Sequence, residues 1–196
     1  QFIHGHGAGK GKTLNLCLNG FDIIGGTGVN RIFNIYGTLN LCDHKQADGS
    51  YNGDVISNYE GTDTKTGRVF YIQNSATNGS GTFNMYGGEI YGGNAATDGG
   101  NIAATSADSD PGDFYLNIYG GKIYGGTAGG NGGNIFGNNR THVNIAGGEI
   151  TDGKWHYDET PLAIQDNMGI YDLAHYRVEF EICFQSFVNK DNTSIF

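Results

Sequence analysis

Proline, cysteine and basic residues are all scarce in this chain of 196 residues, and each shortage excludes a class of protein. With two prolines, and without a glycine at every third position, the chain is not a collagen. Three cysteines are too few for a small domain built around a framework of disulfides. The 11 Lys and Arg residues form no basic cluster, so nucleic acid is not expected as a partner.

Long apolar segments are also lacking. No run approaches the roughly 20 residues that span a membrane, so membrane insertion is not expected. The net charge of -9 also disfavours binding to anionic lipid surfaces. The chain begins at Gln1 and shows no signal peptide, which predicts a processed protein or an excised module.

Glycine, by contrast, accounts for 35 of the 196 residues, well above its usual share of about 7%. Each glycine inside a helix costs about 1 kcal/mol, so an ordinary helical domain is not expected. The hydrophobic content of 37% and the aromatic content of 12% supply enough core to argue against disorder. The remaining class is a β-rich repeat protein with glycine at its turns.

Three segments share one pattern, in which a glycine pair separates two short strands: 81–93, 115–126 and 141–151. Weaker copies of the first strand, with the sequence Thr-Leu-Asn-Leu-Cys, occur at 13–17 and 38–42. A motif that recurs while the loops between its copies vary in length indicates a repeat architecture.

A second motif precedes the first in each period, at 31–35, 68–72, 100–104 and 133–136, with 162–165 as a candidate last copy. Each period is therefore expected to contain three short strands. Such strands cannot pair within a period, so each is expected to pair in parallel and in register with its equivalent in the next. This predicts an all-β parallel β-helix, a solenoid of about five to six coils.

Side chains in these strands should alternate between the core and the outside. Phe83 and Met85 are expected to point inward, whereas Asn84 and Tyr86 point outward. The glycine pairs should form one recurring corner, where a positive φ would penalise other residues. We expect a flexible leader at 1–12, coils at 13–169, and a final coil or C-terminal cap at 170–196, with little or no N-terminal cap.

Several runs resemble the right-handed parallel β-helix repeats of large secreted Gram-positive surface proteins: Leu16–Gly20, Gly37–Asp43 and Phe83–Gly88. The Gly-Gly-Asn-Ile motifs at 99–102 and 132–135 are similar to the Gly-Gly-Ala-Ile repeats of autotransporter-like outer-membrane proteins. The resemblance covers about residues 13–165 and implies a right-handed coil at an extracellular or cell-surface location. Pectate lyases and polygalacturonases share this architecture, so the fold alone does not decide the activity.

Catalytic motifs of those enzymes are not recognisable here. Polygalacturonase-like enzymes carry an Asn-Thr-Asp segment and an Asp-Asp pair, which this sequence lacks, and Gly5-His6-Gly7 stands before the first coil. Glu89, Lys122 and Glu149 alternate in sign at equivalent positions, which favours a ladder of ion pairs over a catalytic set. No catalytic residue is assigned, and the chain is expected to be non-enzymatic.

One loop is rich in acidic residues, at 108–113. Asp108, Asp110 and Asp113 partly match the ligand spacing of a calcium loop, but the later bidentate glutamate is missing. A solvated loop is the simpler interpretation and a calcium site is the alternative. No other cofactor is expected.

Two of the cysteines, Cys17 and Cys42, occupy equivalent repeat positions. Neighbouring coils lie about 4.8 Å apart, which is within the Cα limits of a disulfide. In-register parallel side chains point the same way, however, so free stacked thiols are favoured. Cys183 has no partner in the sequence pattern.

The outward faces are the remaining candidates for binding. Amides and rings are expected to stack there as ladders: Asn84, Asn117 and Asn144 on one outer strip with Tyr86 and Tyr119 beside them, and Tyr91 and Tyr124 on the next face. Aromatic rings cover sugar faces and amides bond to hydroxyls, so these ladders suit contact with glycans. The same ladders also stabilise a β-helix through hydrogen bonds and ring packing.

The sequence therefore favours a non-catalytic extracellular β-helix module of a bacterial surface or secreted protein, acting in adhesion, glycan binding or as a structural stalk. Its expected partners are a polysaccharide or a host or cell-surface glycan, and neighbouring domains or copies through the coil ends. The alternatives are a polysaccharide lyase or glycoside hydrolase of the β-helix type, and a filament subunit that stacks through its coil ends.

Overall fold

The chain folds entirely into β structure wherever it is described. The computed structural model describes residues 11–60, 69–75, 79–105, 112–137, 140–155, 170–171 and 181–182. These residues contain strands and turns but no helix. Within these ranges there is accordingly no helix of the length and apolarity that a membrane span requires.

The strands belong to four sheets, which we number in the order in which the later coils pass through them, for example β8, β9, β10 and β11. Sheet 1 runs in the order β1 (Thr13–Cys17), β4 (Thr38–Cys42), β8 (Thr82–Met85), β12 (Phe114–Ile118), β16 (Thr141–Ile145) and β20 (Glu181–Ile182). Sheet 2 runs in the order β2 (Ile23–Ile24), β5 (Asp54–Ile56), β9 (Glu89–Tyr91), β13 (Lys122–Tyr124) and β17 (Glu149–Thr151).

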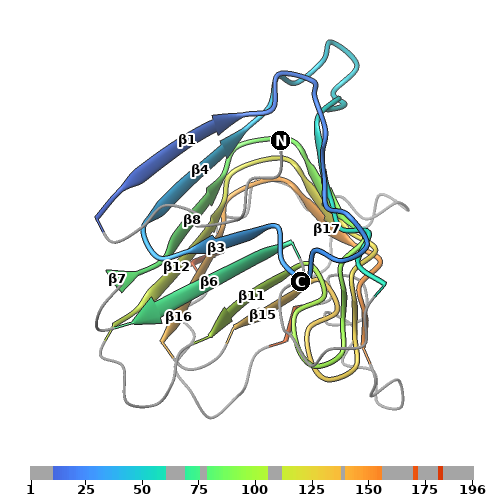
Figure 1. Cartoon of the computed structure of the whole chain (residues 1–196). Coiled ribbons are helices and arrows are strands. Elements are labelled where there is room, and N and C mark those ends of the chain that lie inside the picture. Colours follow the sequence, from blue (N-terminus) through green and yellow to red (C-terminus); the bar gives the residue numbers. More distant parts are fainter. Residues whose placement is uncertain are drawn as a thin grey trace.

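The other two sheets are built in the same way. Sheet 3 contains β10 (Asn94–Ala95), β14 (Thr127–Ala128) and β18 (Lys154–Trp155). Sheet 4 contains β3 (Phe33–Ile35), β6 (Phe70–Ser75), β11 (Ile102–Thr105), β15 (Ile135–Gly137) and β19 (Ile170–Tyr171). Figure 1 shows sheets 1 and 4 as two layers, with β17 of sheet 2 on a third side.

Strands that neighbour each other in these sheets come from successive repeats of the sequence. β1 pairs with β4 in parallel and in register, so that Leu14 opposes Leu39 and Leu16 opposes Leu41. The same holds along each of the four sheets, and the one antiparallel pairing between described residues is that of β7 (Gly79–Ser80) with β6. The predicted parallel pairing of equivalent strands is thus confirmed for the described residues.

The core lies between the sheets and consists of stacked side chains from equivalent positions of successive repeats. Leu39, Leu41, Phe83 and Met85 of sheet 1 are fully buried, as predicted from the alternation. The first coil is less well covered, because among the described residues β1 has a partner strand on one side only. Leu14 is accordingly 39% exposed, whereas its partner Leu39 is 0% exposed.

Each later repeat contains one more strand than expected. The strands of sheet 3 have two residues each, too short for an alternation of polar and apolar residues to be visible in the sequence. The candidate last copy at 162–165 lies outside the described residues. The strand that pairs with β15 is instead β19, in which Ile170 opposes Ile135.

The glycine pairs form the corner between sheets 1 and 2, as predicted. The second glycine of each pair has a positive φ, which is 89° at Gly88, 92° at Gly121 and 90° at Gly148. The first glycine leaves no room for a side chain, since a Cβ on Gly120 would lie 2.7 Å from the carbonyl oxygen of Tyr86. Both members of the pair are therefore required by the geometry of the corner.

The Gly-Gly-Asn-Ile motifs build a second corner around buried asparagines. Asn101 and Asn134 are 0% exposed, and the Nδ2 of Asn101 donates to the Oδ1 of Asn134 over 2.9 Å. The Oδ1 of Asn101 accepts the backbone N–H of Gly93 at 2.9 Å, and its Nδ2 also donates to the carbonyl oxygen of Tyr124 at 2.9 Å. The amide thus satisfies backbone groups that would otherwise be buried without partners.

The corner glycines give a paired stability test. Gly121→Ala places a Cβ at a φ of 92° and 2.6 Å from the carbonyl oxygen of Gly88. Gly125 also has a positive φ, 62°, but open space around its Cα. We expect Gly125→Ala to cost about 1 kcal/mol and Gly121→Ala about 3 kcal/mol or more, measured by urea unfolding. Equal losses would show that the close approach at the corner is unimportant.

The buried asparagine gives a second test. Asn101→Ala removes three buried hydrogen bonds, so we expect a loss of about 3 kcal/mol in the free energy of unfolding. Asn84, whose side chain is half-buried on the outer surface, makes two amide hydrogen bonds. For Asn84→Ala we expect a loss of about 1 kcal/mol or less, because water replaces the missing partner. A larger loss for Asn84→Ala would contradict this ranking.

Candidate ligand-binding face

The outer surface of sheet 1 carries its polar and aromatic side chains in three parallel rows. The first row includes Tyr115 and His142, which oppose each other in β12 and β16. The second row is formed by asparagines, and the third contains Tyr86 and Tyr119, which directly follow β8 and β12. We call the part of this surface built by β8, β12 and β16 the aromatic face: Asn84, Tyr86, Tyr115, Asn117, Tyr119, His142 and Asn144.

The asparagine row is a continuous ladder of amide hydrogen bonds. In each step the Nδ2 of one asparagine donates to the Oδ1 of the preceding one over 2.7 Å: Asn40 to Asn15, Asn84 to Asn40 and Asn117 to Asn84. Asn144 opposes Asn117 in the register of β12 and β16. Each amide within the ladder keeps one further N–H and one further acceptor site for a ligand.

Stacked rings border the asparagine ladder on both sides. The rings of Tyr86 and Tyr119 are 5.0 Å apart with an interplanar angle of 16°. Tyr115 stacks on His142 at 5.0 Å and 13°. Tyr86, Tyr119 and Tyr115 are 50%, 44% and 42% exposed, so these rings present open surface to the solvent.

Asp113 lies beside the aromatic face. Its Oδ2 is 3.6 Å from the Nε2 of His142, an ion pair when the imidazole is protonated. The other two residues of the predicted calcium loop, Asp108 and Asp110, lie outside the described residues. Among the residues that are described, no group of three or more His, Cys, Asp or Glu side chains could hold a metal ion.

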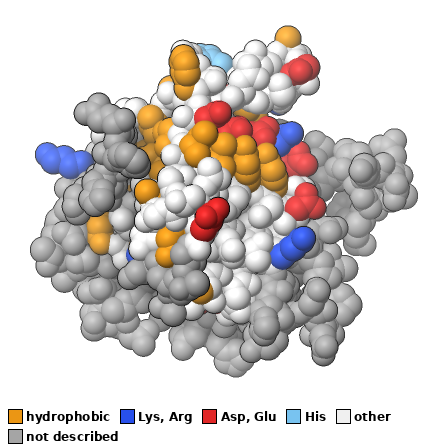
Figure 2. Space-filling model, turned by 45° about the vertical axis from the view of Figure 1, so that its right-hand side comes forward, with side chains coloured by type: hydrophobic (Ala, Val, Ile, Leu, Met, Phe, Trp, Pro, Cys, Tyr) orange, Lys and Arg blue, Asp and Glu red, His pale blue; other side chains and the backbone are white. Residues whose placement is uncertain are grey.

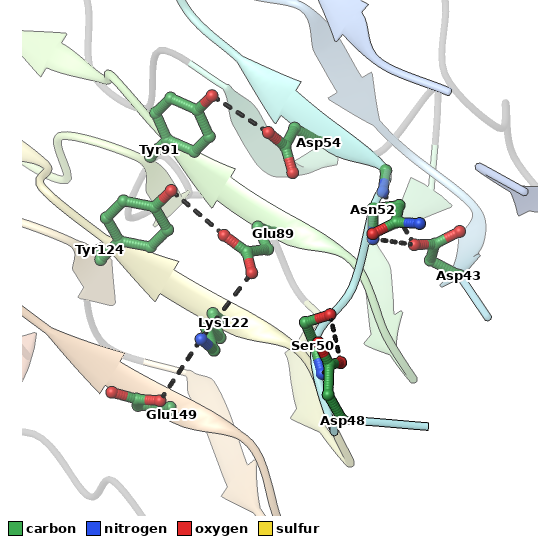
Figure 3. A network of polar contacts seen from close by, with 11 residues as sticks. Asp43, Asp48, Ser50, Asn52, Asp54, Glu89, Tyr91, Lys122, Tyr124 and Glu149 are labelled. Carbon is green, nitrogen blue, oxygen red and sulfur yellow. Dashed lines mark hydrogen bonds and ion pairs between the residues drawn. The ribbon is translucent and has the colours of Figure 1, made fainter. Parts of the chain in front are cut away.

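Tyr91 and Tyr124 stack on the outer surface of sheet 2, at 4.9 Å and 20°. Their hydroxyls are already bound: Tyr91 donates to the Oδ2 of Asp54 over 3.0 Å, and Tyr124 to the Oε2 of Glu89 over 3.1 Å (Figure 3). Burial and the neighbouring carboxylates raise the pKa of Tyr91 to about 12 and raise that of Tyr124 as well. This pair is less available to a ligand than the rings of the aromatic face.

The predicted ladder of ion pairs is present on sheet 2. The Nζ of Lys122 is 3.8 Å from a carboxylate oxygen of Glu89 and 4.0 Å from one of Glu149 (Figure 3). Figure 2 shows this side of the molecule, where a band of hydrophobic side chains lies among several acidic ones. Lys122 thus offsets part of the negative charge that gathers on this side.

The loop between β4 and β5 is tied down by Asp43. Its Oδ1 accepts the N–H of Gly20 at 2.8 Å, and its Oδ2 accepts those of Gly53 at 2.9 Å and Asn52 at 3.1 Å. Tyr51 of this loop lies over the corner of sheets 1 and 2, because a Cβ on Gly87 would meet its ring at 2.7 Å. The loop therefore adds a third tyrosine close to Tyr86 and Tyr119.

The structure places Asn84, Asn117, Asn144, Tyr86 and Tyr119 together on one face, and Tyr91 and Tyr124 on another. Tyr115 and His142 were missed, although each lies two positions before a ladder asparagine and so shares its outward side. Tyr51 was also missed, and its loop carries no repeat signal that would reveal it.

Comparisons with known proteins add no assignment. No protein-family model matches the chain, and no curated protein or solved structure shows a significant similarity to it.

Two acids of this region should respond to pH in opposite ways. Burial raises the pKa of Asp54 above its ordinary value of 3.8, and nearby Asp22 and Glu89 add to the effect, although the Tyr91 hydroxyl opposes it. Burial alone would also raise the pKa of Asp43, but hydrogen bonds from backbone N–H groups outweigh this effect and lower the pKa. As the pH rises from 3.8 to the folded pKa of Asp54, ionisation of this carboxyl therefore lowers the free energy of unfolding. Asp43 acts in the opposite direction: its carboxylate stabilises the fold above pH 3.8, and this stabilisation is lost as the pH falls through its folded pKa.

We therefore expect Asp43→Asn to lower the midpoint of thermal unfolding at pH 7, and Asp54→Asn, which keeps an acceptor for Tyr91, to raise it. The difference for Asp54→Asn should shrink as the pH falls from the folded pKa of Asp54 to about 3.8, and that for Asp43→Asn as the pH falls below about 3.8, because each wild-type carboxyl becomes neutral there. Thermal unfolding followed by circular dichroism at pH 7 and pH 3 checks both signs. Shifts of the same sign for the two variants at pH 7 would contradict the assignment.

Proposed function

We propose that this chain is a right-handed parallel β-helix module of about five to six coils, with a final coil or cap at its C-terminal end. We further propose that it acts outside the cell, as a non-catalytic part of a bacterial surface or secreted protein that binds glycans. Parallel, in-register pairing of equivalent strands in four sheets supports the fold. The aromatic face supports the binding function.

The observation that carries this proposal is the pairing of exposed stacked rings with a ladder of amides. Tyrosine rings offer flat apolar surface to the C–H groups of a sugar, while amides exchange hydrogen bonds with its hydroxyls. The ring rows stand four positions apart along each strand, which corresponds to about 13 Å at about 3.3 Å per residue. A face of this width suits an oligosaccharide better than a single sugar.

The face is also pre-organised. Each amide is held by its neighbours in the ladder, and each ring by the ring of the next coil. Side chains that are ordered before binding lose less conformational entropy when a ligand arrives. A rigid β scaffold that presents such side chains at a regular spacing suits a repeating polymer.

The acids of the described region favour binding over catalysis. A hydrolase of this architecture needs two carboxylates that are free to act on one bond. Asp43 is instead held by backbone N–H groups, Asp54 by the Tyr91 hydroxyl, and Glu89 by Tyr124 and Lys122. These carboxylates have structural partners, which is why we assign no catalytic role to them.

Binding to immobilised plant, bacterial and host polysaccharides tests the proposal. If a glycan binds the wild type, we expect Tyr86→Ala and Tyr119→Ala each to weaken the affinity about 10-fold or more, because each removes a stacking ring worth roughly 1 to 3 kcal/mol. Phe21→Ala is the control, since Phe21 is a 72% exposed aromatic residue that is not one of the residues of the aromatic face. The affinity of the Phe21→Ala variant for the glycan should equal that of the wild type.

Two results would contradict the proposal. Equal affinities for the wild type, Tyr86→Ala and Tyr119→Ala would remove the aromatic face from consideration. Release of reducing ends or unsaturated sugars from a bound polysaccharide would instead indicate an enzyme. The midpoint of thermal unfolding must be measured for every variant, so that loss of folding is not read as loss of binding.

A further inference from the structure

A pair of thiols stands in the first two described coils of sheet 1, in the outer row that continues into Tyr86 and Tyr119 of the aromatic face. Cys17 ends β1 and Cys42 ends β4, and the two residues oppose each other in the parallel register of these strands. Their neighbours Leu16 and Leu41 face the core, so both thiols lie on the outer side of the sheet. Both cysteines are free, with Cys17 exposed and Cys42 half-buried.

The two thiols interact directly but differ in their surroundings. Cys17 and Cys42 oppose each other in the register of β1 and β4, and each affects the environment of the other. Burial, the contact with Cys17 and the negative charge of Asp43 raise the pKa of Cys42 to about 11. A thiol must lose its proton before it attacks a disulfide, so Cys42 is the poorer first nucleophile, and the exposed Cys17 is open to an incoming reagent.

We propose that Cys17 and Cys42 are a redox-active pair, which a small-molecule disulfide oxidises to an intramolecular disulfide that joins the first coil to the second. In-register residues of neighbouring strands lie about 4.8 Å apart, which is within the Cα range of natural disulfides, 4.4 to 6.8 Å. The Cβ atoms must approach to roughly 3.5 to 4.5 Å. Among the described residues β1 has a strand partner on one side only, so its end is able to shift toward β4.

The reaction balances in two exchange steps. The thiolate of Cys17 attacks one sulfur of the small disulfide, which forms a mixed disulfide on Cys17 and releases one small thiolate. Cys42 then loses its proton to solvent and attacks the sulfur of Cys17, which releases the second small thiol. Two protein thiols are oxidised and one small disulfide is reduced to two thiols. Excess small thiol reverses both steps.

The bond would stabilise the least covered part of the described fold. The first coil has an open side, where Leu14 is 39% exposed. A disulfide between the first two coils would keep β1 attached to β4 even where the hydrogen bonds between them open. Oxidation would thus hold the first described coil on the second, and reduction would release it.

Oxidised glutathione at pH 8 tests the pair in the whole chain. We expect the wild type to lose two of its three thiols, with a mass decrease of two hydrogen atoms and a cross-linked peptide that contains Cys17 and Cys42. The midpoint of thermal unfolding should rise by roughly 5 to 10 °C and return on addition of dithiothreitol. Cys183→Ser is the control for the third cysteine and should behave like the wild type.

Single variants test the order of attack. In Cys42→Ser we expect glutathione to remain attached to Cys17, because the resolving thiol is missing. In Cys17→Ser the modification of Cys42 should be at least 10-fold slower, since Cys42 is half-buried and keeps its proton at pH 8. Neither variant should gain thermal stability on oxidation.

Three outcomes would overturn the proposal. The wild type could keep all three thiols after exposure to oxidised glutathione, accumulate only the mixed disulfide, or form disulfides between separate chains. Faster modification of Cys42 than of Cys17 would overturn the proposed order of attack. Because these readouts are thiol counts and masses, they are independent of whether the aromatic face binds a glycan.

Discussion

The in-register parallel pairing of each strand with its equivalent in the next repeat is the constraint on which the rest of the structure depends. It places Leu39 on Leu14 and Phe83 on Leu39, so the core is assembled from stacks of equivalent side chains. The same pairing forces the corners to coincide, because strands of two to six residues leave the chain little room to turn. Glycine at a positive φ and buried asparagine are two solutions to that one requirement.

Register also determines what the outer surface can offer. A side chain that repeats along the sequence becomes a row with a spacing of about 4.8 Å. Asparagine then forms an amide ladder, tyrosine forms stacked rings, and cysteine places two thiols side by side. The proposed glycan contact at the aromatic face and the proposed oxidation of Cys17 and Cys42 are consequences of the same geometry, applied to different residue types.

The sequence predicted much of the fold from particular residues. Alternation around Phe83 and Met85 identified the buried side of sheet 1, and the glycine pairs identified its corner. The strands of sheet 3 were missed because two residues show no period, and β2 and β5 were missed because Ile23–Ile24 and Asp54–Ile56 lack the repeat motif. For the candidate site, the asparagine and tyrosine ladders were predicted. Tyr51 was not predicted, because it lies in an inserted loop that does not repeat along the sequence.

By itself, the sequence determined the all-β repeat, its core positions and the equivalence of its outward residues, since these follow from local periodicity. Only the tertiary structure decided which of the outward tyrosines remain accessible. Tyr86 and Tyr119 face solvent, whereas the hydroxyls of Tyr91 and Tyr124 are bound by Asp54 and Glu89. The difference arises because those acids come from the preceding coil, and a contact between coils is absent from any local pattern in the chain.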